Sequence, residues 1–114
     1  DAPALAAYPK TVLARALLAR GEAARALDLA RAAVTLCDEV ESGLEEVDAL
    51  ARLTYAEALL ATGAASEAGD VARRGAERLR ARAARIQDPT LRAQFLERVR
   101  ENARLLELGA RSAR

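Results

Sequence analysis

The stretch LARALLARGEAARALDLARAA, residues 13–33, recurs 42 residues later as YAEALLATGAASEAGDVARRG, residues 55–75. Eleven of the 21 aligned positions are identical, and alanine, with 30 residues in the chain, accounts for six of them. The other five matches carry more weight: Leu17/Leu59, Leu18/Leu60, Gly21/Gly63, Asp28/Asp70 and Arg31/Arg73. An internal repeat of this length indicates successive copies of one supersecondary unit.

Each copy has the pattern of two helices joined by a tight turn. In the first copy Leu13, Leu17 and Leu18 follow a helical spacing ahead of Gly21, and Gly63 has the same place in the second copy. Glycine adopts the left-handed conformation at a helix end without steric cost, so both glycines are expected to end helices. The repeat therefore predicts two antiparallel helical hairpins within residues 9–86, with helices over about 9–20, 22–39, 44–62 and 64–86.

Helix-start signals support these bounds. Pro9 suits the first turn of a helix, where its missing N–H has no partner within the helix. Residues 1–8 are accordingly interpreted as a linker or the end of a preceding element. Ser42 and Glu45 have the spacing of a capping box. Because the chain starts at Asp1 and not at Met, we interpret it as a piece of a larger protein.

The C-terminal part predicts one further helix. Asp88 can cap its start and Pro89 can occupy its first position. Gly109 is expected to end it, so that residues 87–109 form a capping helix and residues 110–114 a frayed tail. Its core-facing stripe is expected to be Leu91, Phe95, Val99, Asn102/Ala103 and Leu106.

Composition indicates an all-α domain without catalytic chemistry. The 114 residues suit one domain, and the scarcity of aromatic and β-branched residues argues against strands. There is no histidine, no phosphate-binding glycine motif and one cysteine only, so we expect no enzyme activity, no cofactor and no metal site. No stretch approaches the roughly 20 apolar residues of a membrane helix.

Cys37, the single cysteine, cannot form an internal disulfide, which suits a reducing compartment and a cytoplasmic protein. Its apolar neighbours Val34, Leu36 and Val40 predict that it is buried. Asp38 and Glu39 are expected to raise the pKa of its thiol.

The hairpins resemble those of the tetratricopeptide repeat (TPR) family. The small residues that this family places where its helices cross are Ala14, Gly21, Ala26 and Ala33, then Ala56, Gly63, Ala68 and Gly75. The chain departs from the family in having no Trp in the first helix, no Pro at the end of the unit and a period of 42 residues where the family has about 34. The resemblance implies a right-handed superhelical array of stacked hairpins, about five helices in all.

Residues 86–102, IQDPTLRAQFLERVREN, resemble the segment that closes TPR arrays in multidomain bacterial proteins such as kinases and ATPase-type transcriptional regulators. Those tails often have Pro before the Glu-Asn pair, where this chain has Arg100, so the last helix is expected to continue unbroken. The resemblance implies the C-terminal interaction region of a larger bacterial signalling or regulatory protein.

A stacked array leaves the first helices of its units on a concave surface. By the TPR resemblance this surface is lined by Thr11, Arg15, Leu18, Leu53, Glu57 and Leu60. Leu18 and Leu60 either form an apolar ladder for a ligand or pack between helices. Arg15 and Glu57 either orient a ligand or pair with each other.

Two charged clusters have less specific patterns. Arg74, Arg78, Arg82 and Arg85 share one face of a helix and suggest nucleic-acid binding. Interleaved acidic residues and missing aromatics favour instead a solvated face or an acidic protein partner. The acidic residues between Asp38 and Asp48 lack the spacing of a calcium loop and predict a solvated surface.

We therefore expect a scaffold that binds a protein or peptide on its concave face. The first alternative is self-association, through an uncovered apolar end or through the opposite charges of the two halves, −4 for residues 1–57 and +5 for residues 58–114. The second alternative is nucleic-acid binding through the arginine face.

Overall fold

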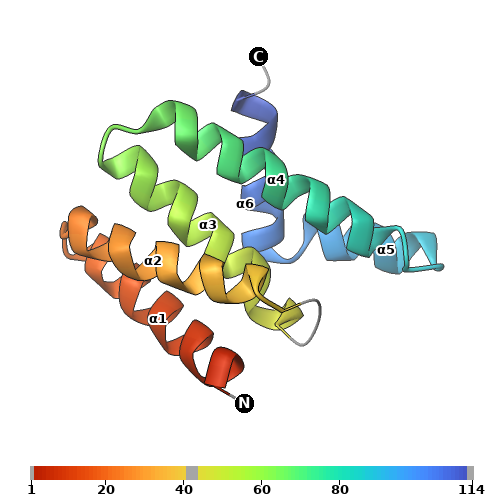
Figure 1. Ribbon diagram of the computed structural model, residues 1–114. Coiled ribbons are helices and arrows are strands. Elements are labelled where there is room, and N and C mark those ends of the chain that lie inside the picture. Colours follow the sequence, from red (N-terminus) through yellow and green to blue (C-terminus); the bar gives the residue numbers. More distant parts are fainter. Residues whose placement is uncertain (1, 41–43, 113–114) are drawn as a thin grey trace.

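A computed structural model describes residues 2–40 and 44–112. Within these residues the chain is all-α, with six helices and no strand (Figure 1). The helices are α1 (Ala2–Ala19), α2 (Ala23–Asp38), α3 (Glu45–Ala61), α4 (Ala65–Ala83), α5 (Pro89–Glu97) and α6 (Arg100–Ser112). None of the described helices is long and apolar enough to cross a membrane.

The first four helices form two antiparallel hairpins, α1–α2 and α3–α4 (Figure 1). Gly21 and Gly63 have positive φ angles of 80° and 87° at the two turns, which confirms that they end helices. The two turns have the same hydrogen-bond pattern: the N–H of Glu22 donates to the carbonyl of Leu17 at 2.9 Å, and the N–H of Ala64 donates to the carbonyl of Leu59 at 2.8 Å. This bond spans the left-handed residue and satisfies a carbonyl left open at the helix end.

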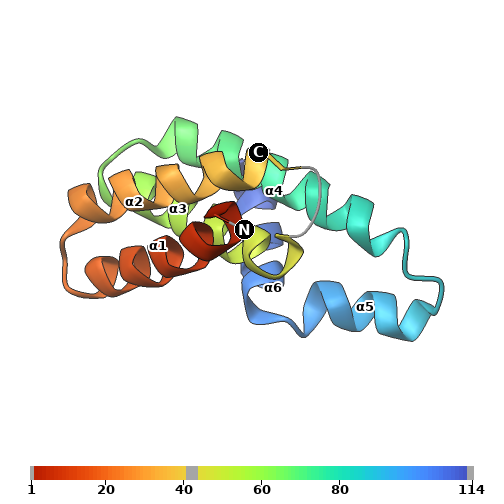
Figure 2. The ribbon, with the colours of Figure 1, turned by 60° about the horizontal axis from the view of Figure 1, so that its bottom comes forward.

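The hairpins are stacked in a regular order. α3 packs against both α1 and α2, and α6 packs against both α3 and α4. α6 thus has the same relation to the second hairpin as α3 has to the first, while α5 contacts only α4 and α6. Within the described residues α1 and α6 make no contact, because α3 lies between them (Figures 1 and 2).

Alanine and leucine form the core between these layers. One apolar cluster joins α1, α2 and α3 near Ala33 and Val47, and a second joins the same helices near Leu17 and Ala58. A third joins α3, α4 and α6 around Leu79, Leu105 and Leu108. Small side chains allow the helices to approach closely, so the apolar core extends from the first hairpin through the second hairpin to α6.

The first helix is longer than the sequence predicts. It begins at Ala2, so residues 2–8 are helical and Pro9 lies inside α1 instead of at its start. Proline removes one backbone hydrogen bond at this position. Ala7 is buried in the apolar cluster that also contains Val34, Cys37 and Val47, and this packing stabilises the helix around Pro9.

The C-terminal part forms two helices, so the prediction of one unbroken helix and of about five helices in all is wrong. Asp88 caps α5 as predicted, since its carboxylate accepts the N–H groups of Thr90 and Leu91. The chain then turns at residues 98–99. There Asn102 donates its amide to the carbonyl of Phe95 at 2.9 Å, which satisfies one of the open carbonyls at the end of α5.

This break changes the core-facing stripe. Leu91 and Val99 are exposed, whereas Leu105 is fully buried. Gly109 does not end a helix: it lies within α6, where an added Cβ would be 3.1 Å from the carbonyl oxygen of Ala72. Residues 110–112 are helical and not a tail, because the hydroxyl of Ser112 contacts α4 at the carbonyl of Gly69.

Candidate functional site: a groove over α3

One side of the stack carries a groove over α3, between α1 and α6. It consists of two adjoining parts of about 650 and 390 Å³, which share Arg15 and Glu57. The smaller part is completed by Leu18, Ala19 and Leu60. The larger part is completed by Leu50, Leu53, Glu97, Arg98, Arg100, Glu101, Ala103, Arg104 and Glu107. We call this surface the α3 groove.

Arg15 and Glu57 form an ion pair where the two parts meet. Arg15 Nη1 lies 3.1 Å from Glu57 Oε1 and also donates to the hydroxyl of Thr54 at 3.1 Å. The Thr54 hydroxyl in turn donates to the carbonyl of Leu50. The sequence left open whether Arg15 and Glu57 orient a ligand or pair with each other, and in the structure they pair with each other. Both side chains are partly exposed, so the pair contributes only about 0–1 kcal/mol and opens at small cost.

The predicted leucines lie at different depths in the α3 groove. Leu60 is 45% exposed and open to solvent, whereas Leu18 is half-buried and also packs on the core near Ala58. Leu53 is buried and forms part of the groove floor. Five of the six residues predicted for the concave face are thus brought together here.

Thr11 is the exception. Its side chain is fully buried and its hydroxyl donates to the carbonyl of Ala7 at 2.8 Å, one turn earlier in α1. A hydroxyl satisfied in this way on a buried helix face has no access to a ligand. Thr11 is aligned with Leu53 by the 42-residue repeat, and both positions face the core.

The α6 wall of the groove was not predicted. It is strongly charged: Arg104 and Arg111 both pair with Glu107, whose pKa is lowered first by the hydrogen bond from Arg104 and then by the charge of Arg111. Arg98 and Arg100, at the junction of α5 and α6, have no ion-pair partner among the residues that the structure describes. These two cations remain available to a ligand.

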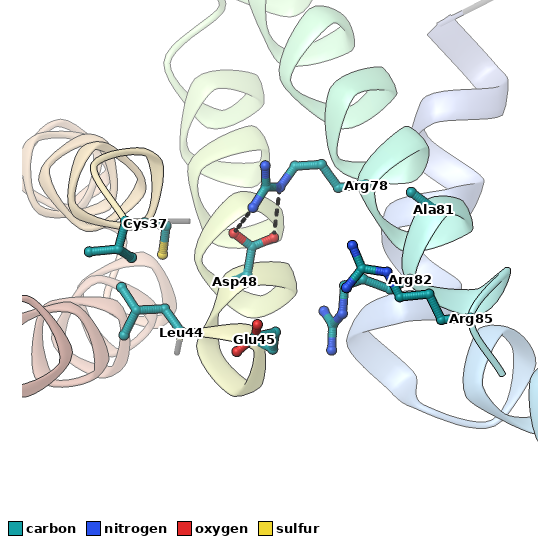
Figure 3. A pocket seen from close by; sticks show the side chains of 9 residues that line it. Cys37, Leu44, Glu45, Asp48, Arg78, Ala81, Arg82 and Arg85 are labelled. Carbon is teal, nitrogen blue, oxygen red and sulfur yellow. Dashed lines mark hydrogen bonds and ion pairs between the residues drawn. The ribbon is translucent and has the colours of Figure 1, made fainter. Parts of the chain in front are cut away.

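The arginines predicted as a basic face are divided between two places. Arg78, Arg82 and Arg85 line a pocket of about 180 Å³ between α4 and the start of α3 (Figure 3), whereas Arg74 lines a different surface beside Arg31. Arg78 pairs with Asp48, and Arg82 lies over the ring of Phe95 at 5.1 Å. Intramolecular contacts therefore hold half of the four side chains, which weakens the case for phosphate binding.

A buried ionic network joins α2, α3 and α4 beside that pocket. Arg52 donates to both carboxylate oxygens of Asp48 and, at 2.6 Å, to Asp38; Arg78 donates to Asp48 from the other side. Burial alone would raise the pKa of Asp48, but the hydrogen bonds from Arg78 and Arg52 outweigh it and the pKa is lowered. For Arg52, burial favours a lower pKa, and the bonds to Asp48 and Asp38 produce a net increase.

The network corrects the expectation of a solvated surface for the acidic residues between Asp38 and Asp48, because the side chain of Asp48 is only 7% exposed. Two of them neutralise Arg52, and in the described part of the chain no three His, Cys, Asp or Glu residues are placed to hold a metal ion. Glu41 and the predicted cap Ser42 lie outside the described residues. Arg52 was not among the predicted site residues, although an Asp four residues before an Arg within a helix is a recognisable pairing signal.

Cys37 is buried beside this network, as predicted. Burial is the main cause that raises the pKa of its thiol to about 11, and the charges of Asp48 and Asp38 contribute in the same direction. The thiol is therefore protonated at neutral pH and packs as a small apolar group.

Comparison of the chain with protein-family models, with curated proteins and with solved structures found no match. The geometry defines an all-α protein of stacked helical hairpins with a mixed-charge groove on one side.

Proposed function

We propose that this chain is a protein-interaction module that binds a peptide segment of another protein in the α3 groove. One observation carries the proposal: three helices that are distant in sequence, α1, α3 and α6, together line an open groove with exposed apolar and charged groups. Grooves of this kind suit extended or helical segments that present side chains at regular intervals.

The array is proposed to be of the TPR-like, right-handed superhelical class. Two features support this: the small residues at the helix crossings, and α1, α3 and α6 placed successively on one side of the stack. By the same resemblance we propose that the module serves a bacterial signalling or regulatory protein. Binding, and not catalysis, is then its role.

The groove chemistry describes the ligand. Leu60, with Leu18 beside it, offers an apolar contact for a side chain such as leucine or isoleucine. Arg98 and Arg100, which have no ion-pair partner in the described part of the chain, offer two cations in the larger part of the groove. Glu57 can exchange its internal pairing with Arg15 for a cation of the ligand. A segment with an apolar anchor and acidic residues to one side of it fits this arrangement.

Selection from a random peptide library displayed on phage, against the immobilised chain, tests the proposal. Selected peptides are expected to lose at least about tenfold in affinity for Leu60→Asp, because a desolvated contact of one leucine contributes about 1.5–3 kcal/mol. Leu91→Asp is the matched control: Leu91 is 56% exposed on α5 and does not line the groove. Equal losses in both variants, or none in either, would refute the site.

The ion pair provides a second test that leaves the fold unchanged. Arg15→Glu combined with Glu57→Arg keeps the pair but reverses its direction across the groove. Circular dichroism is expected to show an unaltered fold and stability, while the selected peptides lose affinity. Unchanged peptide binding by the folded double variant would remove Arg15 and Glu57 from the site.

A further inference from the structure

The 42-residue repeat aligns each position of α1 with a position of α3, so equivalent faces of the two helices can be compared. On α3 the residues Ala51, Tyr55 and Ala58 form a stripe that packs against the first hairpin, α1–α2. Their counterparts on α1, 42 residues earlier, are Pro9, Leu13 and Ala16.

The counterparts on α1 are exposed. Leu13 is 51% exposed and its neighbour Val12 is 46% exposed, while Pro9 and Ala16 are also open to solvent. We call these four residues the α1 outer face. The opposite side of α1 behaves differently, because Ala7, Thr11 and Ala14 are fully buried just as their counterparts Ala49, Leu53 and Ala56 are buried.

The two helices also correspond in charge. On α3 the cation beside the stripe is Arg52, which reaches Asp38 near the end of α2 at 2.6 Å. Its counterpart on α1 is Lys10, which has no ion-pair partner among the described residues. A helix that covered α1 as α2 covers α3 would therefore bring a carboxylate to Lys10 if it carried an acidic residue near its C-terminal end.

We propose that the α1 outer face is the docking surface for a helical hairpin of the α1–α2 type. Its second helix presents alanines with the spacing of Ala26, Ala30 and Ala33, and a carboxylate in the place of Asp38. The new interface would continue the established one between α2 and α3. It would also extend the α3 groove, because the exposed Tyr8 on α1 is the counterpart of Leu50, a groove residue.

This inference does not depend on peptide binding in the α3 groove, since it concerns a different surface. It can be tested by placing a second copy of residues 1–42 in front of the complete chain, with Asp1→Gly in the original copy. The junction then repeats the natural Ser42-Gly43 junction and keeps the 42-residue period.

Docking predicts that the extended chain unfolds in one cooperative transition, at a higher temperature than the natural chain. Backbone amides of residues 9–16 in the original copy are expected to exchange with solvent at least about tenfold more slowly than in the natural chain. Leu13→Glu in the original copy should abolish both changes in the extended chain, yet leave the thermal midpoint of the natural chain within a few degrees. Leu91→Glu, on exposed α5, serves as the control and should leave both changes in place.

Three results would overturn the proposal. The first is an added copy that stays unfolded, or that unfolds in a separate transition, although it is joined through the natural junction and with the natural 42-residue period. The second is an equal effect of Leu13→Glu on the natural and the extended chain. The third is a dimer of the natural chain in light scattering that Leu13→Glu dissociates, since the occupant of the face would then be a second copy of the chain itself.

Discussion

Replacing Asp48 by asparagine removes the charge at the centre of the network that joins α2, α3 and α4, with little change in shape. The side chains of Asp48 and Arg52 are only 7% and 6% exposed. In the variant, the amide oxygen of the asparagine can still accept a hydrogen bond from Arg52, but the only charged partner left to the guanidinium is Asp38, whose own side chain is mostly exposed. Arg52 lines a hollow that is open to solvent, but its side chain is only 6% exposed, so water replaces the lost charge only in part and the cation remains incompletely compensated.

The expected loss of stability follows from these exposures. Removing one partner of a buried ion pair costs about 3–5 kcal/mol, whereas the pairing of the half-exposed Arg78 adds about 0–1 kcal/mol. Because Asp38 still compensates part of the charge, we expect Asp48→Asn to lower the free energy of unfolding by about 3–4 kcal/mol. Urea denaturation at pH 7, followed by circular dichroism, should show the midpoint falling by about 1–4 M, since the urea m-value of a small protein is about 1–3 kcal/mol/M.

The effect should depend on pH. The pKa of Asp48 is lowered in the folded state from its ordinary 3.8, so its contribution to stability is present above that value and is lost as the pH falls through the lower, native pKa. The difference between the natural chain and Asp48→Asn should therefore shrink in strongly acidic urea titrations.

Two further variants make this reasoning refutable. Arg78→Gln removes the exposed partner only and should cost less than about 1 kcal/mol. Asp48→Leu combined with Arg52→Met removes the whole buried pair and should be more stable than Asp48→Asn, because no buried charge is left without a partner and the released Asp38 and Arg78 are exposed enough to be hydrated. If Asp48→Asn stayed within about 1 kcal/mol of the natural chain at pH 7, or if the double variant were the least stable, the account of this network would fail.

Three other predictions concern the turns and the core. Gly21→Ala should cost about 1–2 kcal/mol in urea denaturation, because alanine is strained at a φ of 80° although no atom lies within 4 Å of its Cβ; a neutral result would contradict the turn geometry. Gly75→Ala should lower the melting temperature, because the added Cβ would lie 2.6 Å from Cδ2 of the fully buried Leu105. The overpacking costs about 1–3 kcal/mol, which exceeds the gain of about 1 kcal/mol from the higher helix propensity of alanine. A higher melting temperature would show that Leu105 can move. The Cys37 thiol, buried and with its pKa raised to about 11, should react with a disulfide reagent at pH 8 far more slowly in the native chain than in urea, and equal rates would disprove its burial.

Local signals in the sequence were sufficient to predict the hairpins. A glycine at a left-handed helix end is a requirement of the backbone itself, so Gly21 and Gly63 could be recognised without knowledge of the tertiary structure. The same holds for Asp88, whose side chain bonds to N–H groups two and three residues ahead.

Tertiary contacts decided the features that the sequence did not predict. Pro9 is compatible with a helix start or, at a cost, with a helix interior, and the burial of Ala7 in the core favours the helix interior. The turn between α5 and α6 contains neither proline nor glycine and depends on a side-chain bond from Asn102 to α5. Gly109, expected to end a helix, is required instead for a close approach to α4.

The candidate site was predicted in part for the same reason. The repeat makes residues on α1 and α3 equivalent, and the TPR resemblance assigns them to one face, so Arg15, Leu18, Glu57 and Leu60 could be predicted to share one surface. The α6 wall has no counterpart at the 42-residue spacing, because α5 is inserted between the second hairpin and the helix that packs on it.

The central claim, that a peptide occupies the α3 groove, is tested most directly by nuclear magnetic resonance. The isotopically labelled natural chain would be titrated with the tightest-binding peptide from the display selection. The account predicts that the largest backbone shift changes fall on residues lining the groove in α1, α3 and α6, such as Leu18, Glu57, Leu60 and Ala103. Changes confined to α2 and α5, with the groove residues unaffected, would contradict it.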